Sequence, residues 1–163
     1  MKKILFTLIL SLALQSCDWI KSLGPEETFF CKINGQKFRP EKDVGWDRSG
    51  SLEASWNKTT GVLFITVRNS PKEMSLLLVY NSKNLKEQSF TLEPNTPASK
   101  AYYTPNNGYS KPVYDIISKS GRATITKVDG YYISGTFEFV CKDSTNNKEY
   151  RITEGEFNKL SCY

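Results

Sequence analysis

Two turn signals, each between alternating apolar and polar residues, constrain the fold of this chain most strongly. In residues 28–39, Asn34-Gly35 separates two runs in which apolar side chains recur at every second position. Further along, Asp129-Gly130 joins residues 122–128 to residues 131–142. A period of two is the side-chain period of a half-buried strand, and both dipeptides favour a tight hairpin turn. We therefore expect antiparallel hairpins near both ends of the chain.

The rest of the chain continues this pattern and contains no convincing helix. Further strands are expected over residues 51–57, 62–69, 74–80, 89–92, 101–104, 148–153 and 156–162, with a turn at Gly155. Residues 62–69 and 74–80 are largely apolar on both faces, which is typical of strands covered on both sides at the centre of a sheet. The predicted fold is all-β, either an antiparallel β-sandwich or a partly closed barrel of about ten to twelve short strands.

The first 17 residues have the parts of a secretory signal that ends in a lipidation site. Lys2 and Lys3 precede an apolar run over residues 4–14, which is too short to cross a bilayer. The sequence LQSC at residues 14–17 resembles the lipobox of bacterial lipoproteins. This resemblance implies diacylglycerol on the Cys17 thiol, cleavage before Cys17 and acylation of the new N-terminus. An ordinary signal peptide or a buried N-terminal strand is the alternative.

The expected organisation is a lipoprotein signal peptide at residues 1–16, a lipidated tether at residues 17–27 and a single antiparallel β domain at residues 28–163. Gly24-Pro25 and two adjacent acids are typical of a tether. The expected partner is membrane lipid through Cys17, and the expected location is the cell envelope, on the outer membrane with the face left open. Lysines and arginines number 22 against 17 acids and are interspersed with them, so we expect no nucleic-acid binding.

Histidine is absent from the chain, which removes the usual base of nucleophilic catalysis and the commonest metal ligand. We therefore expect no enzyme activity, no catalytic residues, no metal site and no cofactor. Glu154 and Glu156 are the one pair of carboxylates close enough in sequence to act as general acid and general base. Such a pair would make the protein a hydrolase. Two solvated surface acids are the simpler interpretation.

Residues 143–149 place oxygen-bearing side chains at alternate positions, as calcium loops do. They lack the glycine and the bidentate glutamate of such a loop, so a plain hairpin loop is expected. The sequence Asp143-Ser144-Thr145 also resembles a short motif that some envelope bacteria O-glycosylate, which implies a sugar on Ser144.

Three cysteines remain once Cys17 carries lipid: Cys31, Cys141 and Cys162. Export to an oxidising compartment favours one disulfide and one leftover thiol, and all three pairings are open. Cys31 and Cys141 both fall on apolar strand faces, so either thiol could instead be buried and inert.

Residues 101–114 form a tyrosine-rich segment in the least regular part of the chain. Its Tyr102, Tyr103 and Tyr109 are candidate ligand-binding residues, because tyrosine supplies rigid rings that stack on glycans or small apolar ligands. The alternative is that these rings lie on the barrel or sandwich and seal its end.

Several short motifs together resemble small uncharacterised lipoproteins of Bacteroidetes that carry a domain of unknown function. They are TFFCKING at residues 28–35, residues 121–126, ISGTFEF at residues 133–139 and ITEGEF at residues 152–157. The resemblance implies an all-β lipoprotein and brings no activity with it. The expected function is therefore that of a non-enzymatic, membrane-anchored envelope lipoprotein, with a glycan- or apolar-ligand-binding module as the alternative.

Overall fold

The computed structural model describes residues 27–42, 50–94, 99–106 and 115–163. These residues form ten strands. The strands are β1 (Phe29–Ile33), β2 (Gln36–Phe38), β3 (Leu52–Asn57), β4 (Val62–Asn69), β5 (Lys72–Val79), β6 (Gln88–Thr91), β7 (Lys100–Thr104), β8 (Ile116–Asp129), β9 (Tyr132–Lys142) and β10 (Glu149–Ser161). No helix among the described residues is long and apolar enough to cross a membrane.

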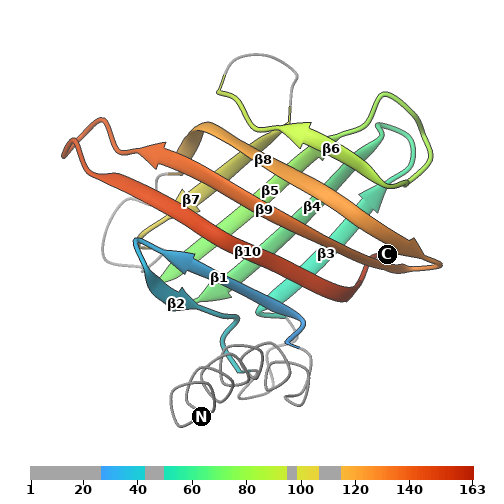
Figure 1. Ribbon diagram of the computed structural model, residues 1–163, viewed down its shortest axis with the longest axis horizontal. Helices are drawn as coiled ribbons and strands as arrows, with labels where there is room; N and C mark the ends of the chain where they lie inside the picture. The colour runs from blue at the N-terminus through green and yellow to red at the C-terminus, as the bar shows by residue number, and fades with distance from the viewer. Residues whose placement is uncertain (1–26, 43–49, 95–98, 107–114) are drawn as a thin grey trace, which may run out of the picture.

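The ten strands belong to one antiparallel sheet that curls into a half-barrel, which confirms the predicted fold class. The strand order is β2-β1-β10-β9-β8-β7-β5-β4-β3, and β6 pairs with β8 beside this path. In Figure 1, β1, β10, β9 and β8 cross in front of β7, β5, β4 and β3, because the sheet has turned back over itself. The apolar side chains of both halves meet in the space between them.

Backbone hydrogen bonds bridge the gap between the two sheet edges at both ends. At one end the Trp56 N–H of β3 donates to the Tyr163 carbonyl oxygen over 2.8 Å. At the other end the Glu41 N–H, just after β2, donates to the Arg68 carbonyl oxygen over 2.8 Å. The fold is therefore a partly closed barrel, in which single backbone hydrogen bonds link the two halves of the described sheet at these two places.

Glycines facing aromatic rings permit the tight curl of β8, β9 and β10. Gly135 of β9 is opposite Phe157 of β10, and Gly155 of β10 is opposite Phe137 of β9. A Cβ at Gly135 would lie 2.5 Å from Phe157 Cζ, and one at Gly155 would lie 2.6 Å from ring carbons of Phe137. Each ring thus lies flat against bare backbone, which only glycine allows.

β-bulges add to the curvature of the same strands. β10 shifts register against β9 between Ile152 and Gly155 and again between Phe157 and Leu160. β8 shifts against β9 between Ser118 and Ser120 and between Ile125 and Lys127. An extra residue on one strand bends it and increases its twist, so these four bulges turn a flat ladder into a curled one.

The interior is filled by aromatic side chains. The Phe137 ring contacts three others, with centroid distances of 5.4 Å to Phe29, 6.4 Å to Phe139 and 6.3 Å to Phe157. On the opposite wall the Tyr80 ring packs edge-on against Trp56 at 5.1 Å and Phe90 at 4.8 Å. These two groups of rings pack together with the aliphatic side chains of the core.

The hairpins at Asn34-Gly35 and Gly130 are confirmed, while three details of the strand prediction are wrong. Gly155 lies inside the continuous strand β10 and marks no turn. β8 has 14 residues and begins six residues earlier than expected, so it is not one of the short strands that were predicted. β4 and β5 lie towards the β3 edge of the sheet, and their outer face is only half covered, since Phe64 is 38% exposed.

The cysteines Cys31, Cys141 and Cys162 are all buried free thiols, so the expected disulfide is not formed. Burial raises the pKa of Cys31 and of Cys141 from the usual 9.0 to about 12, and that of Cys162 to about 11. Because desolvation disfavours the thiolate, these side chains act as small apolar core residues.

We expect Gly135→Ala and Gly155→Ala each to lower the free energy of unfolding by about 3 kcal/mol, because the new methyl group overlaps backbone and ring atoms. In an ordinary strand the same change is favourable, so the sign of the effect tests the close contact. Gly50→Ala is the matched control, since its Cβ would have ordinary contacts of 3.5 Å. Urea denaturation measures all three, and a stable Gly135→Ala variant would contradict the explanation.

We also expect stability to fall as the pH rises above about 9. Each thiol has a higher pKa in the folded state than in the unfolded chain. Its full contribution to the free energy of unfolding is therefore present below pH 9, and the contribution is lost at higher pH because the unfolded chain deprotonates first. The loss should be about 1.4 kcal/mol per pH unit for each thiol. Urea denaturation from pH 8 upwards measures the slope, and Cys141→Ala should remove one thiol's share of it. An unchanged slope in that variant would rule out the thiol as its source.

Candidate functional site

The predicted tyrosine site is divided by the fold. Tyr102 and Tyr103 are neighbours on β7, so their side chains point to opposite faces of the sheet. Tyr103 is a core residue, 2% exposed, with its ring 4.9 Å from that of Tyr150. Burial raises the Tyr103 pKa above its usual value, with Tyr150 adding to the shift. Tyr102 is half-buried on the outer face, and Tyr109 lies outside the described residues.

The paired carboxylates of Glu154 and Glu156 are both exposed, on a bulged part of β10. Glu154 has a positive φ of 52°, and its Oε1 accepts a 2.7 Å hydrogen bond from Lys32 Nζ. The Glu154 carboxylate is thus engaged by a lysine of the neighbouring strand β1.

The loop between β9 and β10 is a compact hairpin connection. Asp143 is buried, its Oδ1 accepts a 2.8 Å hydrogen bond from the Thr145 N–H, and its own N–H donates to the Lys148 carbonyl oxygen. Ser144 is exposed in this turn. Within the described part of the chain, no group of three or more acidic or cysteine side chains is arranged to hold a metal ion. Asp143 thus shapes the turn.

A shallow pocket of about 190 Å³ opens on the outer face of β8, β9 and β10, near the β8–β9 hairpin. Its lining residues are polar or amphipathic and come from all three strands. They are Lys127, Asp129, Tyr132, Ser134, Asn158 and Lys159. We call this the β8–β10 pocket. Two ammonium groups, one carboxylate, a hydroxyl, an amide and a phenol ring line it, so its side chains carry one net positive charge that can attract an anionic group such as a phosphate.

Two bulges create the pocket by widening the space on either side of Ser134. Lys127 pairs with Ser134 directly after the β8 bulge, and in the second bulge of β10 the two residues Asn158 and Lys159 stand opposite the single residue Ser134. Lys159 has a positive φ of 47°, and its N–H donates to Ser134 Oγ over 3.0 Å. Ser134 Oγ in turn donates to Asn158 Oδ1 over 3.1 Å. Ser134 therefore holds the β10 bulge in place.

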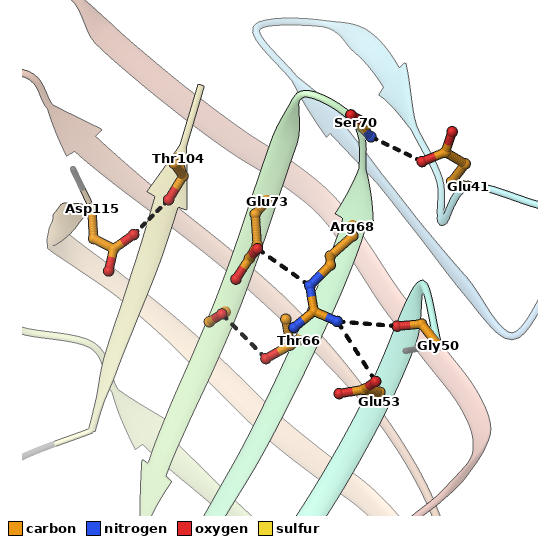
Figure 2. Close-up of polar contacts among 10 residues, drawn as sticks. Glu41, Gly50, Glu53, Thr66, Arg68, Ser70, Glu73, Thr104 and Asp115 are labelled. Carbon is orange, nitrogen blue, oxygen red and sulfur yellow. Dashed lines mark hydrogen bonds and ion pairs between the residues drawn. The ribbon is translucent and has the colours of Figure 1, made fainter. Parts of the chain in front are cut away.

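A second polar cluster lies on the outer face of β3, β4 and β5, near the β4–β5 turn (Figure 2). Arg68 Nε donates to Glu73 Oε2 over 3.3 Å, and its Nη1 lies 3.6 Å from Glu53 Oε1. The same nitrogen donates to the Gly50 carbonyl oxygen over 3.3 Å. The arginine is held by two carboxylates of the protein, so this cluster ties three strands together and presents no uncompensated positive charge to a ligand.

Comparison with known proteins identifies the family. Residues 34–161 match the family model described as Domain of unknown function (DUF6252). The chain belongs to the DUF6252 family. The match begins at the first hairpin turn and runs through β10, so the whole curled sheet apart from β1 lies within the family's domain. No curated protein and no solved structure matches this chain.

The pocket residues of this DUF6252 chain carry little signal in the sequence. Lys127 and Lys159 are far apart in sequence, and neither belongs to a motif. One signal was available, because Tyr131 and Tyr132 directly follow the predicted Asp129-Gly130 turn. Aromatic residues at a hairpin tip have little chance of burial, and the structure leaves them 73% and 53% exposed.

We expect Ser134→Ala to lower the free energy of unfolding by about 1 kcal/mol, because the Lys159 N–H and the Asn158 side chain both lose their partner. Ser144→Ala, in an exposed turn, is the matched control and should change stability by less than about 0.5 kcal/mol. Thermal or urea denaturation measures both. Equal stability of the two variants would show that Ser134 does not support the bulge.

Proposed function

We propose that this DUF6252 protein is a non-enzymatic, lipid-anchored protein of the cell envelope, of the kind found among small Bacteroidetes lipoproteins. The observation that carries the proposal is the sequence of residues 1–17, in which a basic start and a short apolar run end at Ser16-Cys17. Acyl chains on Cys17 would hold the domain at a membrane without crossing it, since each buried methylene adds about 0.8 kcal/mol of affinity.

The arrangement of the domain supports a binding role and not a catalytic one. Both carboxylates of the best pair are exposed, and Glu154 is engaged with Lys32. The three thiols beyond Cys17 are buried, with pKa values of about 11 to 12. A nucleophilic thiol requires a lowered pKa and access to solvent. These groups are therefore poor candidates for chemistry, and the proposed role is recognition or attachment at the envelope.

A ligand-binding role is the second candidate, and the β8–β10 pocket favours it over the tyrosine segment. The pocket is open to solvent and lined by groups that can bind an anion, whereas Tyr103 of the predicted segment is buried in the core. The two lysines and the Tyr132 ring suit a ligand that carries an acidic group on an apolar or ring-bearing body.

We expect Cys17→Ala to prevent incorporation of labelled fatty acid and to release the protein from the membrane fraction. The reason is that no other cysteine lies at the lipobox. Cys162→Ala is the matched control, because it removes a buried thiol and should leave labelling and membrane association unchanged. Metabolic labelling followed by membrane fractionation measures both properties. Labelled fatty acid retained by the Cys17→Ala variant would disprove the anchor.

A further inference from the structure

Three exposed tyrosines lie at the end of the half-barrel that holds the β8–β10 pocket, and one of them, Tyr132, lines it. Tyr131, Tyr132 and Tyr163 are 73%, 53% and 84% exposed. The Cys162 N–H donates to the Tyr131 carbonyl oxygen over 2.7 Å, so the backbone places Tyr163 beside the hairpin tip. We call these tyrosines together with the pocket the tyrosine end. Rings left in water at one rim of a small domain mark a contact surface.

The turns around the tyrosine end carry an excess of positive charge. The β3–β4 turn reaches this end because Trp56 bonds to Tyr163, and residues 81–87 adjoin that turn because the Tyr80 N–H donates to the Gly61 carbonyl oxygen. Together with residues 126–134 and 158–163, these segments contain five lysines, Lys58, Lys83, Lys86, Lys127 and Lys159, and two acids, Glu87 and Asp129. The surface here attracts anions.

The described chain enters the domain next to the same pocket. The Thr28 carbonyl oxygen accepts a 2.9 Å hydrogen bond from the N–H of Asn158, which lines the pocket. The segment from Asp18 to Glu27 separates Thr28 from Cys17. Fully extended, such a segment spans about 35 Å at most, at roughly 3.3–3.6 Å per residue. An acylated Cys17 would therefore keep the tyrosine end close to the lipid surface.

We propose that the tyrosine end is a second membrane contact, in which the β8–β10 pocket binds the phosphate of an anionic phospholipid and the tyrosine rings lie among the headgroups. The inference rests on the proposed lipid anchor. Lysine ammonium groups bind phosphate, and tyrosine is enriched at membrane interfaces because its ring is apolar and its hydroxyl polar. A membrane explains the tyrosines and the lysines together, which a free anion does not.

The ion pair inside the pocket is compatible with phosphate binding. Lys127 Nζ lies 3.6 Å from Asp129 Oδ2, and the two side chains are 63% and 75% exposed. Such an exposed pair contributes little to stability, so the ammonium group can exchange the carboxylate for a phosphate oxygen. The anchor raises the local concentration of headgroups, and a weak site is then sufficient to orient the domain.

The test uses the purified acylated protein in nanodiscs of phosphatidylcholine, with or without phosphatidylglycerol, and follows backbone hydrogen exchange by mass spectrometry. We expect slower exchange in residues 127–134 and 158–163 only in the discs that contain phosphatidylglycerol. High salt should remove this protection because it screens the lysines. Equal exchange in both kinds of disc would overturn the proposal.

A double variant and a matched control separate this surface from general charge effects. Lys127→Glu/Lys159→Glu should lose the protection, whereas Lys72→Glu/Lys119→Glu, with the same charge change at exposed lysines away from the tyrosine end, should keep it. Loss of protection in both would overturn the proposal. Protection by soluble glycerophosphate or by an acidic glycan in discs of phosphatidylcholine alone would also overturn it and reassign the pocket to a soluble ligand.

Whether the protein carries acyl chains is measured separately, from the intact mass of the purified protein. A chain without them would disprove the anchor, and vesicles added in solution would then still test the tyrosine end. In that arrangement, vesicle association should fall about fivefold for each of the two pocket lysines lost. Failure of the anchor and failure of the second contact are thus distinct results.

Discussion

The contact of aromatic rings with glycine backbone is the constraint on which this structure depends. Phe157 lies over Gly135 and Phe137 over Gly155, so β9 and β10 approach each other in a way that no side chain larger than hydrogen permits. This lets the sheet bend sharply enough to cover its own apolar face. A domain with no described helix has no other element to cover that face, and curling replaces the second layer that packed helices would supply.

The bulges that accompany the curl also create the surface features of the domain. On the inner face they leave each ring paired with a glycine of the neighbouring strand. On the outer face they widen the spacing around Ser134, where the pocket lies. Glu154 and Lys159 reach positive φ at two of these positions, and side-chain partners stabilise both: Lys32 for the first and Ser134 for the second. The same β-bulges therefore shape both the packing of the core and the candidate site.

Sequence patterns predicted the local pairing well and the long strands less well. Asn34-Gly35 and Asp129-Gly130 placed two hairpins correctly, because the turn chemistry is local. Gly155 was interpreted as a turn, since a glycine between two acids has the composition of a loop, yet it faces the core beneath a ring. In the tyrosine segment, neighbouring strand residues point to opposite faces, so Tyr103 packs in the core while Tyr102 lies on the outer face.

The sequence by itself determined an antiparallel all-β domain, because periodicity and turn residues are properties of neighbouring residues. Only the tertiary structure decided which edges are bridged, that Cys31, Cys141 and Cys162 remain thiols, and that Lys127, Ser134 and Lys159 share a pocket. These features depend on register between strands distant in the chain, and register follows from how the rings and glycines pack together.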